Sequence, residues 1–251
     1  MQLGKLPPSF ENTVPRIAHY VTGALPPPPS AIDYSSPVLQ WGTFLNTPPA
    51  DYNDCTIAAA AHAIQLWTAN TGEQLTLSDG DVTAAYQKFA GSDFKKALKV
   101  QDVLGYWYSH GIGDHQIQAY GQLEPQNQIQ VEDCIDLLGV CYIGLGLPAF
   151  ITKRPSESLP GIWQLQPYGP TGDGTPTHDD GHAIVAFGYD VRFLNFVSWG
   201  SKYQMTWQFY NTYMDEAYGI ASQDWIVQKT GMSPSGFDLD SLRHDLKIIV
   251  G

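Results

Sequence analysis

Two stretches of the chain carry the clearest hydrophobic patterns. Residues 55–67 form an alanine-rich run without glycine or proline. This run predicts a helix buried in a core, because alanine has the highest helix propensity and small side chains allow close packing. Asn53 or Asp54 is expected to cap its first turn. Residues 182–189 are almost wholly apolar and predict a buried strand.

Weaker patterns complete the set of expected elements. Further helices are predicted at residues 81–89, 100–109, 131–138 and 206–217, and further strands at residues 140–147 and 193–199. A loop rich in glycine, proline and serine is expected up to Asp180. Since helices come first and strands second, the pattern predicts an α+β protein with a helical lobe and an antiparallel β lobe.

The first part of the chain differs from the rest in composition. A run of four prolines favours an extended polyproline segment. Residues 1–30 are therefore expected to be a proline-rich arm that wraps over the domain or links it to another part. For the first fifteen residues the alternative is a flexible tail. Residues 31–251 are expected to form one domain. Its helical lobe is mainly residues 50–138 and its β lobe mainly residues 139–230.

The charge of the chain limits its partners. The formal net charge is −12, which repels phosphate backbones and anionic membranes. We therefore expect neither a nucleic acid nor a membrane as a partner. The apolar runs are too short to span a bilayer, and the first residues contain no apolar signal-peptide core.

The cysteines and histidines indicate neither a fold built on disulfides nor a metal site. Three cysteines cannot all pair within one chain, no CxxC occurs, and no cluster has zinc-ligand spacing. A His/Asp run at residues 178–182 is expected to be a polar loop rather than a metal site. We expect no metal and no organic cofactor.

Three segments carry candidate chemistry. Cys55 opens the predicted central helix, where the helix dipole favours a nucleophilic thiolate, although a cysteine there is also a common core residue. His182 begins an apolar strand, where it could act as a base or could simply be hydrogen-bonded in a loop. Ser198 and Trp199 follow sixteen and seventeen residues later, and could orient the imidazole and shield it from water.

In this order, the segments resemble the papain-like cysteine peptidases. The resemblance spans residues 31–207 and rests on Ala31-Ile32-Asp33-Tyr34, Cys55, Gly181-His182-Ala183, Gly188-Tyr189 and Ser198-Trp199-Gly200. It implies a two-lobed fold in which the central helix carries Cys55, and in which Cys55 and His182 face each other across a cleft. The implied substrate is a peptide or protein.

The chain departs from the family pattern at two functional positions. Val197 stands where the family has the asparagine that orients the histidine, so Asn195 or Ser198 is expected to take that role, unless a Cys–His dyad suffices. Asn195 shares a strand face with Val197, which favours it by direction. Pro49 stands where the family has an oxyanion-binding glutamine.

A substitute for the missing glutamine is expected nearby. Asn46 is the candidate donor, together with the backbone N–H of Cys55. Losing one such donor typically slows an enzyme by about two to three orders of magnitude. Asp54 is expected to support the site by capping the helix.

The resemblance implies a cysteine hydrolase that cleaves peptide or related amide bonds through an acyl-enzyme. The sequence does not distinguish hydrolysis from transfer of the acyl group to an amine. The alternative is a catalytically silent papain-like binding or structural module. The family's usual disulfides are absent, which favours a bacterial or phage-type member that is cytoplasmic or phage-associated. The oligomeric state stays open.

Overall fold

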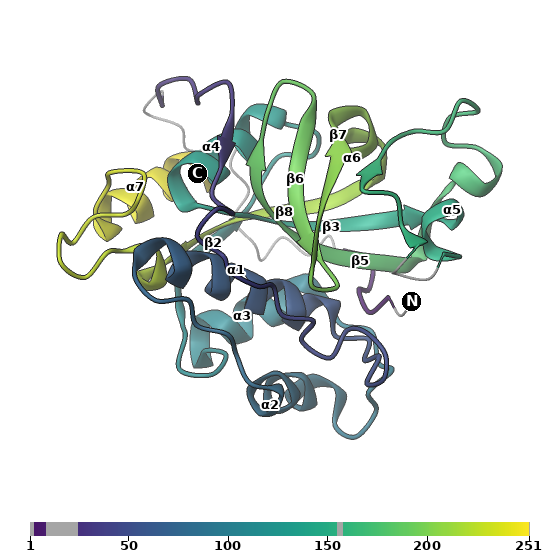
Figure 1. Ribbon diagram of the computed structural model, residues 1–251, viewed down its shortest axis with the longest axis horizontal. Helices are drawn as coiled ribbons and strands as arrows, with labels where there is room; N and C mark the ends of the chain where they lie inside the picture. The colour runs from purple at the N-terminus through teal and green to yellow at the C-terminus, as the bar shows by residue number, and fades with distance from the viewer. Residues whose placement is uncertain (1–2, 9–24, 155–157, 251) are drawn as a thin grey trace.

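Helices and a sheet form two sides of the molecule (Figure 1). The computed structural model describes residues 3–8, 25–154 and 158–250. Three helices lie on one side: α1 (Cys55–Thr71), α2 (Asp79–Ala90) and α3 (Val100–His110). The strands lie on the other side, and α1 packs against them.

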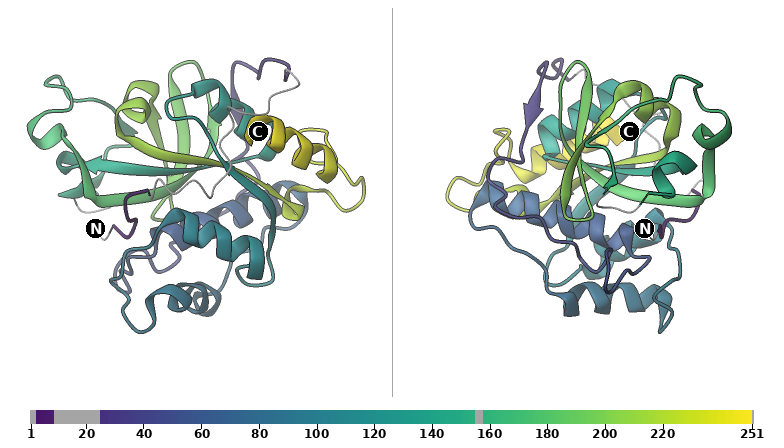
Figure 2. Two further views of the ribbon diagram at one scale, coloured as in Figure 1. Left: turned by 180° about the vertical axis from the view of Figure 1, so that it is seen from behind. Right: turned by 45° about the vertical axis from the view of Figure 1, so that its right-hand side comes forward.

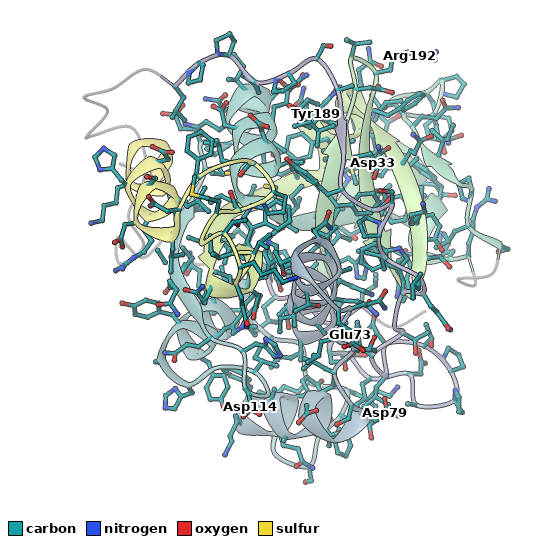
Figure 3. All side chains as sticks on the ribbon, turned by 60° about the vertical axis from the view of Figure 1, so that its left-hand side comes forward. Asp33, Glu73, Asp79, Asp114, Tyr189 and Arg192 are labelled. Atoms are coloured by element: carbon teal, nitrogen blue, oxygen red, sulfur yellow. The ribbon has the colours of Figure 1, made fainter. Side chains whose placement is uncertain are left out.

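One sheet contains eight strands of the described chain. Its spatial order is β2 (Ile117–Gln122), β8 (Met214–Ser222), β3 (Cys141–Pro148), β5 (Pro176–Tyr189), β6 (Phe193–Ser198), β7 (Ser201–Thr206) and β4 (Ile162–Trp163), and β1 (Ile32–Asp33) also pairs with β5. The β4–β7 pair is parallel and the other pairs are antiparallel. Figure 3 labels Asp33 and Tyr189, which mark the pairing of β1 with β5.

The remaining helices cover parts of the sheet. They are α4 (Gln128–Leu138), α5 (Ala149–Thr152), α6 (Trp207–Tyr213) and α7 (Leu239–Val250). Figure 2 shows α7 beside β2 and β8, which it contacts. The predicted α+β class, with a helical side and an antiparallel sheet, is confirmed.

The central helix is the most buried part of the chain. Residues 55–67 are all buried, as their alanine-rich pattern predicts, and the helix continues to Thr71. Tyr142 of β3 donates a hydrogen bond of 2.6 Å to the Thr56 carbonyl. Trp67 donates one of 2.8 Å to the Leu138 carbonyl. These bonds fix α1 against the sheet and the end of α4.

Three predicted elements differ from the structure. The helix predicted at residues 206–217 ends at Tyr213, because the following residues form β8 between β2 and β3, and pairing on both edges outweighs local helix propensity. Strand β2 lies between α3 and α4, where the sequence pattern predicts no strand. The loop expected up to Asp180 ends earlier, since β5 begins at Pro176.

The outer surface of the helical side carries exposed acids, among them Glu73, Asp79 and Asp114 (Figure 3). In the described ranges, no helix combines the length and apolarity needed to cross a bilayer.

The packing of α1 gives a stability prediction. Ala60 is fully buried, so Ala60→Leu should overpack the core and lower the free energy of unfolding by about 1–3 kcal/mol. The same change at Ala84, exposed on α2, is the matched control and should alter stability by less than about 0.5 kcal/mol. Urea unfolding measures both. Equal effects would contradict the packing described for α1.

Candidate active site

Cys55 is the first residue of α1 and is 1% exposed. As the first helical residue, its backbone N–H has no acceptor within the helix. Asp54 occupies the N-cap position, but its side chain makes no capping hydrogen bond, which corrects the expected cap. The Asp54 carboxylate instead accepts a hydrogen bond of 3.0 Å from the Asn46 side chain.

His182 lies on β5 and is held by two residues from the end of β6. Its Nε2 shares a hydrogen bond of 2.7 Å with the Ser198 hydroxyl. The Trp199 ring stacks on the imidazole, with centroids 4.3 Å apart and planes 12° from parallel. The Nδ1 atom has no hydrogen-bond partner among the described residues. One ring nitrogen is therefore held in place while the other stays free.

A tight turn places Trp199 over the imidazole. Ser198 pairs with Ser201, so Trp199 and Gly200 alone connect β6 to β7. Both have positive φ, 48° and 71°, as a two-residue type I′ hairpin turn requires. Glycine adopts such a φ freely, whereas a tryptophan does so only where its surroundings enforce it.

Ser198, not Asn195, contacts the imidazole, and the strand register explains this. Val185 of β5 lies opposite Val197 of β6, so these two share a face of the sheet. His182 is three residues from Val185 and Ser198 is one residue from Val197, so both lie on the other face. Asn195 shares the face of Val197 and accepts a hydrogen bond of 2.9 Å from the side chain of Gln204. Asn195 therefore does not orient His182, contrary to the prediction from its strand face; Ser198 contacts the imidazole instead.

Asn46 does not present a free donor. Its side-chain amide donates to the Tyr52 carbonyl at 2.8 Å and to Asp54 Oδ1 at 3.0 Å, which uses both of its hydrogens. Burial raises the pKa of the Asp54 carboxyl well above its ordinary value, and the Asn46 hydrogen bond acts against that rise. In this arrangement, the Asn46 amide binds Asp54 and the Tyr52 carbonyl and has no hydrogen left for an oxyanion.

The segments of Cys55 and His182 meet directly. A backbone hydrogen bond from Ala183, the residue after His182, reaches the Cys55 thiol. His62 of α1, whose Nε2 is 2.8 Å from the Gly42 carbonyl oxygen, lies close enough to His182 to influence its charge. The structure thus holds His182 in contact with Ser198 and Trp199, and it places Cys55 next to Ala183, the residue that follows His182.

Residues 3–8, which we call the covering segment, lie beside β5 (Figure 1) and pack against the residues that precede Cys55 and His182. The Lys5 N–H donates to the Gly181 carbonyl at 3.1 Å, on the residue before His182. The Leu6 N–H donates to the Leu98 carbonyl, and the Leu98 N–H to the Gly4 carbonyl, each at 2.7 Å. The segment therefore bridges β5 and the helical side.

Gly4 permits this close approach. A Cβ at Gly4 would lie 1.7 Å from the carbonyl oxygen of Asn53, so no larger residue fits without movement. A backbone hydrogen bond from Gly4 also reaches the Cys55 thiol. The proline-rich composition predicts an arm here, but nothing in the sequence pattern singles out Gly4 or Lys5. Residues 9–24 of the predicted arm lie outside the described residues.

Burial keeps both candidate reactive groups neutral. It raises the pKa of the Cys55 thiol to about 11, although backbone hydrogen bonds from Ala183 and Gly4 favour the thiolate. It also lowers the pKa of His182 to about 3, with the positive charge of Lys5 contributing. In this covered state, the two groups are a thiol and a neutral imidazole at pH 7.

In the part of the chain that the structure describes, no group of three or more His, Cys, Asp or Glu residues is arranged to hold a metal ion. The side chains of residues 178–180 lie outside that part.

The raised pKa of Cys55 gives a prediction for thiol alkylation. A thiol reacts through its thiolate, so below its pKa the rate rises about tenfold per pH unit. In the native protein, iodoacetamide should modify Cys55 slowly at pH 7, with a rate that keeps climbing towards pH 11. Peptide mapping by mass spectrometry gives the rate for each cysteine, and the protein unfolded in denaturant is the control. A fast rate with a plateau below pH 7 would show an exposed thiolate instead.

Neither the protein-family models nor the curated proteins include a match to this chain. Several solved structures are similar. Xylellain, a cysteine protease from Xylella fastidiosa, has a TM-score of 0.61 at 15% identity, covering 87% of this chain and 95% of that one. Procathepsin B S9 from Trypanosoma congolense has a TM-score of 0.60 at 9% identity, with coverage of 88% and 86%. Digestive procathepsin L 3 of the Tenebrio molitor larval midgut has a TM-score of 0.57 at 10% identity, with coverage of 86% and 75%. These likenesses show that the chain has the papain-like fold.

Proposed function

We propose that the protein is a cysteine hydrolase that cleaves peptide bonds. Cys55 is the nucleophile and His182 the general base. The observation that carries the proposal is the held imidazole: Ser198 binds its Nε2, Trp199 covers its face, and its Nδ1 is left free. A nucleophile beside a base that is itself oriented by a third group is the common arrangement of covalent hydrolases.

The reaction follows from these positions. With its proton on Nε2 directed to Ser198, His182 accepts the thiol proton at Nδ1. The Cys55 sulfur attacks the carbonyl carbon, and His182 returns the proton to the leaving nitrogen as the C–N bond breaks. A water molecule then gives a proton to His182 and attacks the thioester, which releases the carboxylic acid and restores the thiol.

The oxyanion needs a donor at the start of α1. The Cys55 backbone N–H is suited to this role, because the helix leaves it without an internal acceptor and the helix dipole favours negative charge there. Asn46 could contribute only by releasing the Tyr52 carbonyl or Asp54. This supports a role for Asn46 in fixing the loop before Cys55.

Substrate can reach Cys55 only after the covering segment moves. In the covered state the Cys55 side chain is buried with the backbone of Gly4 near it, so the thiol is closed to a substrate carbonyl. When the segment leaves, water reaches Cys55 and His182. Solvation then lowers the pKa of Cys55 and raises the pKa of His182, which favours the thiolate and the imidazolium.

Charge and thiol state support the remaining parts of the proposal. The net charge of −12 favours a peptide or protein substrate over a nucleic acid. All three cysteines are free and buried, which suits a reducing compartment in a bacterial or phage-associated setting.

A catalytically silent papain-like module is the second candidate. The specific observation that favours it is the covered Cys55, which is 1% exposed and has a raised pKa. A module of this kind would keep the fold and the segment without turnover.

Peptide cleavage separates the two candidates. An unfolded protein substrate is incubated with the wild type and with Lys5→Glu, in which repulsion from the nearby acids Asp215 and Glu216 should release the covering segment. Mass spectrometry counts the new peptide termini. We expect cleavage that increases in Lys5→Glu and disappears on Cys55→Ala. His182→Gln should slow it by about 10²–10⁴-fold.

Cys134→Ala is the matched control, because Cys134 is an equally buried thiol in α4. It should retain activity once folding is verified by circular dichroism. Cleavage that survives Cys55→Ala would exclude Cys55 as the nucleophile. Complete inactivity of the folded wild type and folded Lys5→Glu would support the silent module.

A further inference from the structure

Lys5 of the covering segment is a buried cation close to the reactive pair. Its side chain is 0% exposed. The ammonium nitrogen lies 2.9 Å from Asp215 Oδ2, 3.0 Å from Glu216 Oε1 and 2.9 Å from the Leu6 carbonyl oxygen. Both acids belong to β8, a strand that the sequence pattern did not reveal.

Gly144, Asp215 and Glu216 lie around the Lys5 side chain, and we call the space that this side chain fills the pocket. Gly144 of β3 forms its wall, because a Cβ there would lie 2.4 Å from Lys5 Cε and 2.7 Å from Glu216 Cγ. Tyr218 donates a hydrogen bond of 2.7 Å to Glu216 Oε2 and so fixes that carboxylate. A glycine inside an apolar strand often marks such a close approach.

The charges in this pocket call for a cation. The side chains of Asp215 and Glu216 are 14% and 1% exposed, and a buried carboxylate without a partner is costly. Burial raises the pKa of Glu216, and the charge of Lys5 is the strongest influence against that rise. Asp215 Oδ1 has no hydrogen-bond partner within the described chain, so the pocket offers one acceptor beyond the carboxylate oxygens that contact Lys5.

The pocket adjoins the reactive pair. The backbone of Lys5 bonds to Gly181, which precedes His182, and Gly4 reaches the Cys55 thiol. A chain that replaced the covering segment along the same path would place one side chain between Gly144 and the two acids while its backbone passed Cys55.

We infer that Gly144, Asp215 and Glu216 form a recognition pocket for a lysine or arginine side chain of the substrate, and that Lys5 fills this pocket in the covered state. The inference rests on the proposed function, since it assigns the substrate class of the same site. Arginine suits the pocket as well as lysine, because its guanidinium offers five donors to the carboxylate oxygens.

A protection experiment tests the pocket without requiring turnover. The full chain carrying Lys5→Met loses the internal cation but keeps a side chain of similar length. Two peptides are added: one with the sequence of residues 3–8, Leu-Gly-Lys-Leu-Pro-Pro, and one with norleucine in place of lysine. The measured quantity is the peptide concentration that halves iodoacetamide modification of Cys55.

The lysine peptide should halve the modification at a concentration about tenfold to a hundredfold lower than the norleucine peptide does. This is the range expected for a hydrogen bond to a charged group. Glu216→Gln or Asp215→Asn, added to Lys5→Met, should reduce this preference. The matched control is Asp173→Asn, an exposed acid paired with Lys153, which should leave it unchanged. Equal protection by both peptides would overturn the pocket.

Gly144→Ala in the otherwise wild-type chain gives a second test if Lys5→Met does not fold. The added methyl group should displace the Lys5 side chain and raise the rate of Cys55 alkylation by about tenfold or more. An unchanged rate would contradict the pocket, because the methyl group and the Lys5 side chain cannot share that space.

Cleavage of two peptide substrates that differ only in whether they carry a basic residue separates this inference from the proposed function. Cleavage with no preference for a basic residue would reject the pocket and leave the hydrolase intact. Selective protection by the lysine peptide without cleavage of any substrate would support the pocket and reject the hydrolase.

Discussion

Close packing of α1 against the sheet sets the position of the candidate site. A run of small buried residues lets the helix approach β5, and this contact sets Cys55 next to Ala183, the residue that follows His182. Pairing of β5 with β6 then brings Ser198 to the imidazole. Larger side chains on α1 would separate the candidate nucleophile from its base, even if every polar residue of the site were kept.

Burial determines the chemical state of this site. Cys55 and His182 are both 1% exposed, and desolvation drives their pKa values apart, towards a thiol and a neutral imidazole. The covering segment is held at two neighbouring residues. Gly4 lies near the thiol, and Lys5 fills the pocket of Asp215 and Glu216. The same contacts that close the site thus indicate what kind of chain fits it.

Much of the fold could be predicted from local pattern, because α1 and β5 have strong periodic or continuous apolar runs. The site could be predicted only as far as ordered motifs allow. Ser198 was a candidate, but its role over Asn195 depends on the register between β5 and β6, which a single strand does not reveal. Residues 3–8 carry no local signal of burial, since their partners Leu98, Gly181 and β8 are distant in sequence.

Covalent trapping by a lysine-containing peptidyl vinyl sulfone measures whether Cys55 is an activated thiol that a peptide can reach. Its electrophilic carbon forms a stable bond only with an activated thiol that the peptide can reach. We expect one adduct per chain, mapped to Cys55, that forms faster in Lys5→Glu than in the wild type and is strongly slowed by His182→Gln. Labelling of Cys134 or Cys141 at the same rate, or labelling of Cys55 that is indifferent to His182, would contradict this expectation.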